Sequence, residues 1–507
     1  MKYIEGQNRT QINLFPITLD DSISQDNDVR LIDLFVNTLD AKDLGFKVDH
    51  IENGRPAFHP KDLLRIYIYG YMNSIRSSRN LEKECKRNLE MIWLVKGLAP
   101  DHNTISNFRR DNPKAIKKVF QLTVKIASHF NLIGGKLIAG DSTKLRAQNS
   151  KKTNFNEKKI KRHLEYIERK LTEYTKLLWE CDVDKDRKEI EQEISKHENR
   201  KQGYQQVQQQ LKQSGVTQIS TSDPQSRQMI TRNNITEVAY NIQTTVDAKH
   251  YIPFDYVVTN TNDAKAMGMM LQRAKDILKT NEFTALYDKG YHTGSEFKMA
   301  EELGIDVLVA IPRVAAQAPN PAYNVEHFIY HQHSDSYECP EGNELHTTGT
   351  WHKAKTYMFK RYTTKDCLKC PVKADCSKAK YGKGIQRSEY QSVIEKNKIR
   401  IAQNKDYYRQ RQSIVEHPYG TIKRQWGFNY IMTKKYKRRA EADVGLIFTV
   451  YNFKRIIKLI DTKELIKYLK ELVLFIIKIN SLARFKLSLY KDPIFKMNNP
   501  SFFYKVT

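Results

Sequence analysis

The spacing of apolar and polar positions separates a helical N-terminal part from the rest of the chain. Residues 59–130 carry apolar residues at helical intervals, beginning with HPKDLLRIYIYGYM, and turn-like breaks such as RSSRN and GLAPDHN divide the helices. We therefore expect an all-α N-terminal domain over residues 1–130. Beyond residue 461 the chain reads as a basic amphipathic tail, residues 461–507, whose apolar run LVLFII is far shorter than the roughly 20 residues that span a membrane.

A strand pattern begins at Gly134, where GGKLIAGDSTKL reads as a buried strand that ends in a polar residue. Alternation in VAYNIQTTVDAKHYIPFDYVVTN predicts an antiparallel pair that turns near residues 247–250. Further apolar strands in FTALYDKGY and VLVAIP are separated by helices, and VGLIFTVYNFKRIIKLI reads as a buried closing helix. These elements predict an α/β domain with a mixed sheet over residues 131–460.

The highly charged residues 155–215 interrupt this domain with a heptad pattern. Apolar residues first repeat at steps of four and three, at Ile160, Leu164, Ile167, Leu171, Tyr174 and Leu178, and a second set follows at Ile190, Ile194, Tyr204, Val207 and Leu211. Two such stripes joined by the segment DVDKDR predict an antiparallel helical hairpin inserted into the α/β domain. We favour an architectural role without chemistry for it.

The charge of the chain indicates its class of partner. Lys and Arg number 85 against 58 Asp and Glu, which gives a formal net charge of +27 spread along the whole length. Nucleic acid suits this distribution because many phosphates can be neutralised together, whereas a membrane-surface protein concentrates its charge beside an apolar anchor. A basic protein without a polyanionic partner is the alternative. The N-terminus, MKYIEGQNRTQINLFPITLDD, has no continuous apolar stretch, so we expect no signal peptide and a cytoplasmic protein.

The segment DHNTISNFRRD is a candidate DNA-contacting helix. With Asn103 or Thr104 as its cap, the helix would display Asn107, Arg109 and Arg110, the residue types with which recognition helices reach bases and phosphates. An ordinary solvated helix carries the same set, and both interpretations stay open.

Three acids are candidates for phosphodiester chemistry. Asp141 and Asp288 each follow an apolar strand, and Glu416 stands much later in the basic helical segment RQSIVEHPYGTIKRQWGF. Strand ends deliver side chains to one edge of a sheet, where carboxylates can hold Mg²⁺, and two such ions can promote attack on a phosphodiester. The alternative is that acids after strands only cap helices.

Four of the six cysteines fall in a Cys-rich segment, residues 320–385, which we expect to be a second insertion. They are Cys339, Cys367, Cys370 and Cys376, and four thiolates suffice for a tetrahedral structural Zn²⁺. The C-x₂-C pair is the stronger part of this motif, and His346 or His352 is an alternative fourth ligand. Ordinary reduced cysteines in a surface insertion are the other interpretation.

Three blocks of the chain resemble the signature blocks of DDE transposases from bacterial insertion sequences, in the same order. They are GDSTKLRA around Asp141, YDKGYHTG around Asp288 and VEHPYGTIKRQWGF around Glu416. HPKDLLRIYIYGYM, PDHNTISNFRR and STSDPQSRQM followed by VAYNIQTTVD resemble that group as well, so the similarity covers about residues 30–455. The resemblance implies an RNase H-like catalytic domain, dependence on Mg²⁺ or Mn²⁺, binding to terminal inverted repeats, and cut-and-paste movement by hydrolysis and strand transfer.

The family's Glu block also carries a tyrosine, an arginine and a lysine at fixed intervals. Lys423 stands seven positions after Glu416, as the family pattern requires, and the resemblance implies that it holds a DNA phosphate. The upstream half is shifted, because Tyr408 and Arg411 each stand one residue earlier than the family positions. Lys423 is therefore the stronger candidate for DNA binding, ahead of Arg411.

Together these features predict a metal-dependent DNA transposase that acts on double-stranded DNA. We expect a homodimer assembled on terminal inverted repeats and target DNA, in the bacterial nucleoid and away from membranes. A nuclease of the same fold and a non-catalytic DNA-binding derivative of a transposase are the alternatives. The three intact acids argue against the second of these, because a purely binding protein has no need of them.

Overall fold

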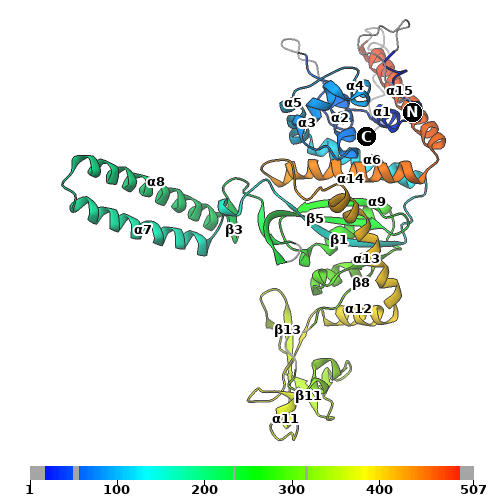
Figure 1. Cartoon of the computed structure of the whole chain (residues 1–507). Coiled ribbons are helices and arrows are strands. Elements are labelled where there is room, and N and C mark those ends of the chain that lie inside the picture. Colours follow the sequence, from blue (N-terminus) through cyan, green and yellow to red (C-terminus); the bar gives the residue numbers. More distant parts are fainter. Residues whose placement is uncertain (1–17, 49–55, 232–233, 314–317, 492–507) are drawn as a thin grey trace, which may run out of the picture.

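A mixed sheet forms the centre of the molecule in the computed structural model, which describes residues 18–48, 56–231, 234–313 and 318–491. Its strand order is β4-β5-β1-β7-β8, with β6 also paired to β5 (Figure 1). β5 is antiparallel to β1, β4 and β6, whereas β7 is parallel to both β1 and β8. The strand bounds are β1 Leu137–Arg146, β4 Arg227–Ile230, β5 Thr236–Asp247, β6 Ile252–Thr259, β7 Thr284–Tyr287 and β8 Asp306–Val309. The protein is therefore of mixed α/β class, and the antiparallel pair predicted to turn near residues 247–250 is confirmed as β5 and β6.

Helices connect the parallel strands and cover the sheet. α9 (Met267–Leu278) precedes β7, and α10 (Gly294–Leu303) leads from β7 to β8. Further along the chain, α12 (Gln391–Gln403) packs against β8, and α13 (Lys405–Tyr419) packs across β1, β5 and β7. α13 continues into a π-helical turn at Gly420–Gln425. The basic segment that carries Glu416 therefore crosses the sheet.

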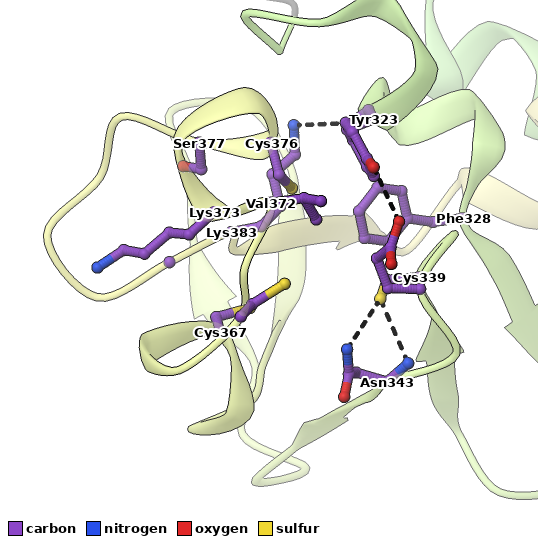
Figure 2. A pocket seen from close by; sticks show the side chains of 13 residues that line it. Tyr323, Phe328, Cys339, Asn343, Cys367, Val372, Lys373, Cys376, Ser377 and Lys383 are labelled. Carbon is purple, nitrogen blue, oxygen red and sulfur yellow. Dashed lines mark hydrogen bonds between the residues drawn. The ribbon is translucent and has the colours of Figure 1, made fainter.

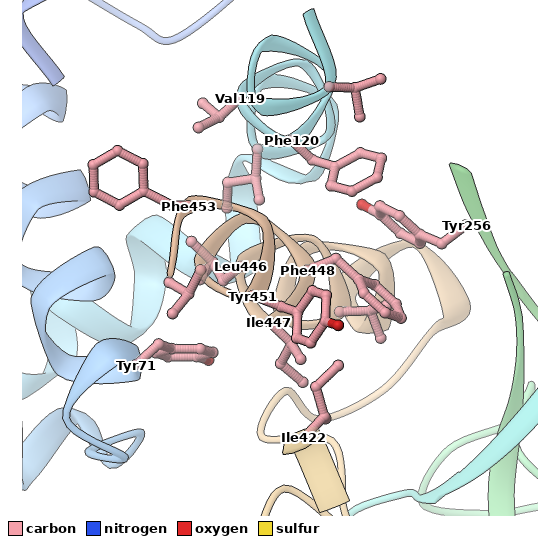
Figure 3. Packing of buried hydrophobic residues seen from close by; sticks show 14 of the residues in the cluster. Tyr71, Val119, Phe120, Tyr256, Ile422, Leu446, Ile447, Phe448, Tyr451 and Phe453 are labelled. Atoms are coloured by element: carbon pink, nitrogen blue, oxygen red, sulfur yellow. The ribbon is translucent and has the colours of Figure 1, made fainter. Parts of the chain in front are cut away.

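The N-terminal helices share their hydrophobic core with the sheet. α14 (Lys437–Leu459) is buried on nearly all sides because it lies between α2 and α6 on one face and β6 on the other (Figure 3). Phe448 of α14 stacks on Tyr256 of β6 at 5.5 Å between ring centroids, and Phe120 of α6 meets the same tyrosine edge-on at 5.0 Å. One cluster of buried residues consequently runs from Ile23 to Leu469. The helices concerned are α1 Asp28–Asn37, α2 Pro60–Met72, α3 Ser78–Arg87, α4 Leu89–Leu94, α5 His102–Asp111 and α6 Pro113–His129.

Two long antiparallel helices project from the edge of this body (Figure 1). They are α7 (Glu157–Trp179) and α8 (Asp184–Ser214), and the short strands β2 (Asn154–Asn156) and β3 (Gln218–Ser220) pair at their base. Ile160 and Ile167 of the heptad stripe are buried in the seam, whereas Trp179 at the tip is 86% exposed. The helix pair predicted from the heptad spacing is therefore present, although α8 begins within the segment expected to turn.

A second, smaller sheet lies on the opposite side from the N-terminal helices (Figure 1). Its order is β12-β13-β11-β10-β9, with β14 paired to β13, and Phe328, Tyr337, Leu345, Tyr362 and Ile385 form its own core. Its strands are β9 Ile329–His331, β10 Ser336–Glu338, β11 Glu344–Thr347, β12 His352–Lys353, β13 Met358–Thr363 and β14 Ile385–Ser388, and the short helix α11 (Lys373–Cys376) lies between the last two.

The C-terminal helix α15 spans Thr462–Lys491, and Leu465 and Leu469 join the main core. None of the helices in the described ranges combines the length and the apolar content needed to cross a bilayer.

Candidate active site

Asp141 and Asp288 lie beside each other on neighbouring strands. β1 and β7 pair in parallel with Ala139 opposite Leu286, so extending this register by two residues brings Asp141 level with Asp288. Adjacent strands are about 4.8 Å apart, which sets the scale of the separation between the two backbones. Asp288 directly follows the end of β7, as expected, whereas Asp141 lies within β1, so the expectation that the strand ends before Asp141 is wrong. β1 continues to Arg146 because these residues keep pairing with β5. The convergence of the two acids on one metal ion stays a prediction.

Each of the two acids also makes local hydrogen bonds. Asp141 Oδ1 accepts a hydrogen bond from the Ser142 amide at 2.7 Å. Asp288 caps the 3-10 turn Lys289–Tyr291, because its Oδ1 accepts from the Gly290 amide at 2.8 Å. The helix-cap interpretation therefore describes Asp288 correctly, and it leaves a second carboxylate oxygen for other chemistry.

Burial and the neighbouring charges together set the pKa of Asp141. Burial raises the pKa of the Asp141 carboxyl to about 6 against the opposing effect of Arg411, and the charges of Asp288 and Asp263 add to the rise. Arg411 Nη1 lies 3.4 Å from Asp141 Oδ2, and its side chain is only 17% exposed. The Arg411 guanidinium group is therefore the counter-charge of the Asp141 carboxylate.

Asp263 is a third acid at this place, and the sequence analysis missed it. It opens a 3-10 turn at Asp263–Lys265, four residues after β6 ends at Thr259. Its Oδ1 accepts hydrogen bonds from Asn241 at 2.7 Å and Gln243 at 2.8 Å, and its Oδ2 lies 3.2 Å from Lys144 Nζ. Burial would raise the pKa of Asp263, but Lys144 and these hydrogen bonds hold it below its usual value. An acid shortly after a strand was the available signal, but three intervening residues obscured it.

One face of α13 is turned toward the acids. Tyr408 donates a hydrogen bond to the Tyr287 carbonyl at 2.9 Å, immediately before Asp288, and Tyr419 donates to the Asp141 carbonyl at 3.2 Å. Arg411 lies three residues after Tyr408, hence on the same side of the helix, and it contacts Asp141. The structure thus brings Tyr408 and Arg411 to the acids even though each is displaced by one residue from the family pattern.

Glu416 lies on the same helix but on a more exposed side. Its Oε1 accepts a hydrogen bond from the Gln412 side chain at 3.0 Å, and the residue is exposed. In the part of the chain that the structure describes, no three His, Cys, Asp or Glu side chains are close enough to be ligands of one metal ion. Membership of Glu416 in a metal triad therefore stays a prediction.

Lys423 contacts β1 beyond Asp141. Its Nζ donates to Thr143 Oγ1 at 3.1 Å and to the Lys144 carbonyl at 3.4 Å. The ammonium group is therefore held two to three residues along the strand from Asp141, which is compatible with a contact to DNA at the same sheet edge.

The helix expected to display Arg109 to DNA instead buries it. Arg109 is 3% exposed, and its Nη1 donates to the Tyr71 hydroxyl at 2.8 Å and lies 3.5 Å from Asp443 on α14. The surface position expected for Arg109 is therefore wrong, because its guanidinium is held in a buried ion pair that joins two helices.

Other residues of this helix were predicted to cap it or to contact DNA. Asp101 rather than Asn103 or Thr104 caps α5. Asn107 is exposed, and Arg110 is partly exposed and forms an ion pair with Asp111 at 2.6 Å, so both stay candidates for DNA contact.

The four clustered cysteines line one small pocket in the second sheet (Figure 2). Its volume is about 20 Å³, roughly the space of one water molecule. Cys339 Sγ accepts from the Asn343 amide at 3.3 Å, and burial raises the pKa of the Cys376 thiol, to which the other three cysteines contribute. The structure brings the predicted ligand set together without placing three of them at the separations of a metal site.

Comparisons with known proteins identify two segments. Residues 17–111 match a transposase domain (DUF772), and residues 338–457 match a transposase DDE domain. The second match contains the cysteines, Glu416 and Lys423, whereas Asp141 and Asp288 lie in neither. A search of curated proteins found no match.

Two solved transposase structures show a remote likeness. One is the piggyBac transposase in a synaptic complex with hairpin DNA, with 10% identity and a TM-score of 0.30 over 87% of this chain and 79% of that one. The other is a pre-cleavage Mos1 transpososome, with 12% identity and a TM-score of 0.15 over 54% of this chain and 65% of that one.

Proposed function

We propose that the chain is a DNA transposase that cleaves and rejoins phosphodiester bonds at the ends of an insertion sequence, because it matches a transposase domain and a transposase DDE domain. In this proposal Asp141, Asp288 and Glu416 are the catalytic acids and hold Mg²⁺ or Mn²⁺. DDE transposase domains generally use divalent metal ions. The DNA substrate is double-stranded and carries terminal inverted repeats, and two copies of the chain assemble on it with target DNA.

The observation that carries this proposal is the parallel pairing of β1 and β7. It sets Asp141 level with Asp288, where the pKa of Asp141 is raised to about 6 and Arg411 is drawn in as a partner. Two partly buried carboxylates side by side repel each other, and a divalent cation with hard oxygen ligands relieves that repulsion. The donor set therefore fits Mg²⁺ or Mn²⁺.

The topology of the sheet supports an RNase H-like core. Three strands, β6, β5 and β1, run antiparallel to one another in that order, and the two parallel strands β7 and β8 follow on the other side. This is the arrangement expected of an RNase H-like sheet. In this assignment the catalytic domain spans residues 131–460 and contains both the helical hairpin at residues 155–215 and the Cys-rich insertion at residues 320–385.

The chain's own residues then have distinct roles. Divalent ions held by these acids would supply activation of the attacking oxygen and stabilisation of the leaving oxygen of the phosphodiester. Asp141 and Asp288 supply oxygen ligands from the strands, and Glu416 supplies one from α13. Arg411 orients the Asp141 carboxylate, and Lys423, held by β1, places a positive charge beside the DNA backbone.

The other parts of the chain have supporting roles in this proposal. The N-terminal helices, residues 1–130, contact DNA through Asn107 and Arg110 on α5. Cys339, Cys367, Cys370 and Cys376 hold one structural Zn²⁺ in the second sheet, because a single small pocket collects all four thiols.

Strand cleavage by single-acid variants tests the proposed function. The substrate is a duplex that contains the DNA flanking the gene, incubated with Mg²⁺ or with a chelator. Asp141→Asn and Asp288→Asn should each lose nicking by several orders of magnitude, because a metal site supplies several kcal/mol to the transition state. Asp406→Asn, which changes an exposed aspartate of α13, is the matched control and should nick normally.

Two outcomes would contradict the proposal. Normal nicking by both site variants would remove Asp141 and Asp288 from the chemistry. DNA binding by the wild-type protein without cleavage in Mg²⁺ or Mn²⁺ would favour the non-catalytic DNA-binding derivative instead.

A further inference from the structure

A basic pocket lies behind α13, between that helix and α14. Its volume is about 240 Å³, several times the roughly 30 Å³ that one water occupies in the liquid. Lys454, Arg455 and Lys458 of α14 line it together with His417 of α13 and Trp426 beyond the π-helical turn. All of its lining residues are described, and none of them is acidic. We call it the basic pocket.

Two of its three cations are fixed in place by the fold. Lys454 Nζ donates to the Met72 carbonyl at 2.6 Å and lies 5.3 Å from the Trp426 ring centroid. Arg455 Nη2 donates to the His250 carbonyl at 2.8 Å, and its buried Nε makes no hydrogen bond. Both charges are therefore preorganised.

The positive charges of the pocket repel one another. Lys454 and Lys458 are four residues apart on α14, where like charges destabilise a helix. Burial and then Lys458 lower the pKa of Lys454. An anion that enters the pocket would relieve this repulsion, and preorganised cations in a concave site concentrate anions from solution.

We propose that the basic pocket binds a backbone phosphate of DNA. A phosphate fits the available volume, and Lys and Arg side chains are its usual partners. His417 follows Glu416 directly on α13, so DNA held at the pocket runs beside the candidate catalytic acid of that helix. The identity of the anion as DNA rests on the proposed function, whereas the affinity of the pocket for phosphate does not.

Lys458→Gln is the most direct test, because Lys458 lines the pocket, is exposed and makes no contact that the fold requires. Lys463→Gln, which changes an exposed lysine in the first turn of α15, removes the same charge outside the pocket and is the control. Both full-length variants are assayed for duplex binding between 50 and 200 mM salt, in chelator so that no cleavage is needed.

Loss of one phosphate contact reduces the slope of log affinity against log salt by about 0.9. The ratio of wild-type to Lys458→Gln duplex affinity should therefore fall about 3-fold from 50 to 200 mM salt, whereas Lys463→Gln should keep the wild-type slope. Equal slopes for both variants would overturn the proposal.

A second arm distinguishes DNA from free phosphate. Inorganic phosphate should raise the melting temperature of the wild type and of Lys463→Gln more than that of Lys458→Gln. Protection of this kind with unchanged DNA binding would show that the pocket takes a free phosphate, which overturns its assignment to DNA. Because these readouts need no cutting, a failure of the catalytic triad leaves them interpretable.

Discussion

A buried ion pair between α14 and the N-terminal helices yields a large predicted loss of stability. The Asp443 carboxylate is fully buried, and it contacts Arg76 at 2.5 Å and Arg109 at 3.5 Å. The side chains of both arginines are about 5% exposed. The Tyr71 hydroxyl and the Met432 amide also donate to it. Asp443→Asn leaves two buried guanidinium groups without their counter-charge. Removal of one partner from a buried pair typically costs about 3–5 kcal/mol, so we expect a loss of that size in the free energy of unfolding.

Urea unfolding followed by circular dichroism measures this loss. The matched control is Asp406→Asn, whose aspartate is 91% exposed and whose ion pair with Arg409 should contribute less than about 1 kcal/mol. A loss below about 1 kcal/mol for Asp443→Asn would refute the inference that this carboxylate ties the helices together.

The pH dependence of the same pair gives an independent check. Arg76 and Arg109 hold the pKa of Asp443 below its usual value despite its burial. A depressed folded-state pKa contributes stability that is fully present above the unfolded value, about 3.9, and is lost as the pH falls through the folded value. The stability difference between wild type and Asp443→Asn should therefore be constant at neutral pH and shrink below about pH 4.

Three further changes have defined outcomes. DNA affinity should fall by about three to five decades between 50 and 200 mM salt if six to ten phosphates are neutralised, and a nearly flat titration would contradict an electrostatic interface. Elemental analysis of reduced protein purified without chelator should find one zinc per chain, and the Cys370→Ala variant should lose this zinc while it still nicks DNA. Wild-type protein without zinc would contradict the predicted zinc site. Gly140→Ala should lower the free energy of unfolding by about 1–3 kcal/mol or more, because the new Cβ would lie 2.0 Å from the buried ring of Tyr287. An unchanged melting temperature would contradict this packing.

The features that the sequence predicted well have a local periodic signal. The apolar runs before Asp141 and Asp288 mark the neighbouring parallel strands β1 and β7, although β1 continues past Asp141 to Arg146 because these residues pair with β5. The heptad stripe from Ile160 predicted the helix pair for the same reason, since its spacing specifies which face is buried.

The features that the sequence analysis missed depend on partners far along the chain. Arg109 was placed on the surface because its helix looks amphipathic, but its partner Asp443 is 334 residues away. The clue in the sequence was at Asp443, the single acid in the apolar run ADVGLIFTVYNF. A buried charge of that kind requires a cationic partner.

The register of α13 shows a second limit. The family spacing favoured Lys423 over Arg411, yet Arg411 contacts Asp141 and Lys423 contacts the next residues of β1. Spacing specifies which residues share a face only in a regular helix, and here a π-helical turn begins at Gly420, between Glu416 and Lys423. The sequence could not show where that turn falls.

The central claim is the metal-holding role of Glu416, and a paired assay of nicking and binding on Glu416→Gln tests it most directly. This change keeps the size of the side chain but removes the charge that a hard cation needs. Glu165→Gln, which changes an exposed glutamate of α7, is the control. With Mg²⁺ and a transposon-end duplex, Glu416→Gln should lose nicking by several orders of magnitude while binding stays level or rises, because an acid near phosphates has been neutralised. Near-normal nicking by Glu416→Gln, with folding and binding intact, would contradict the triad.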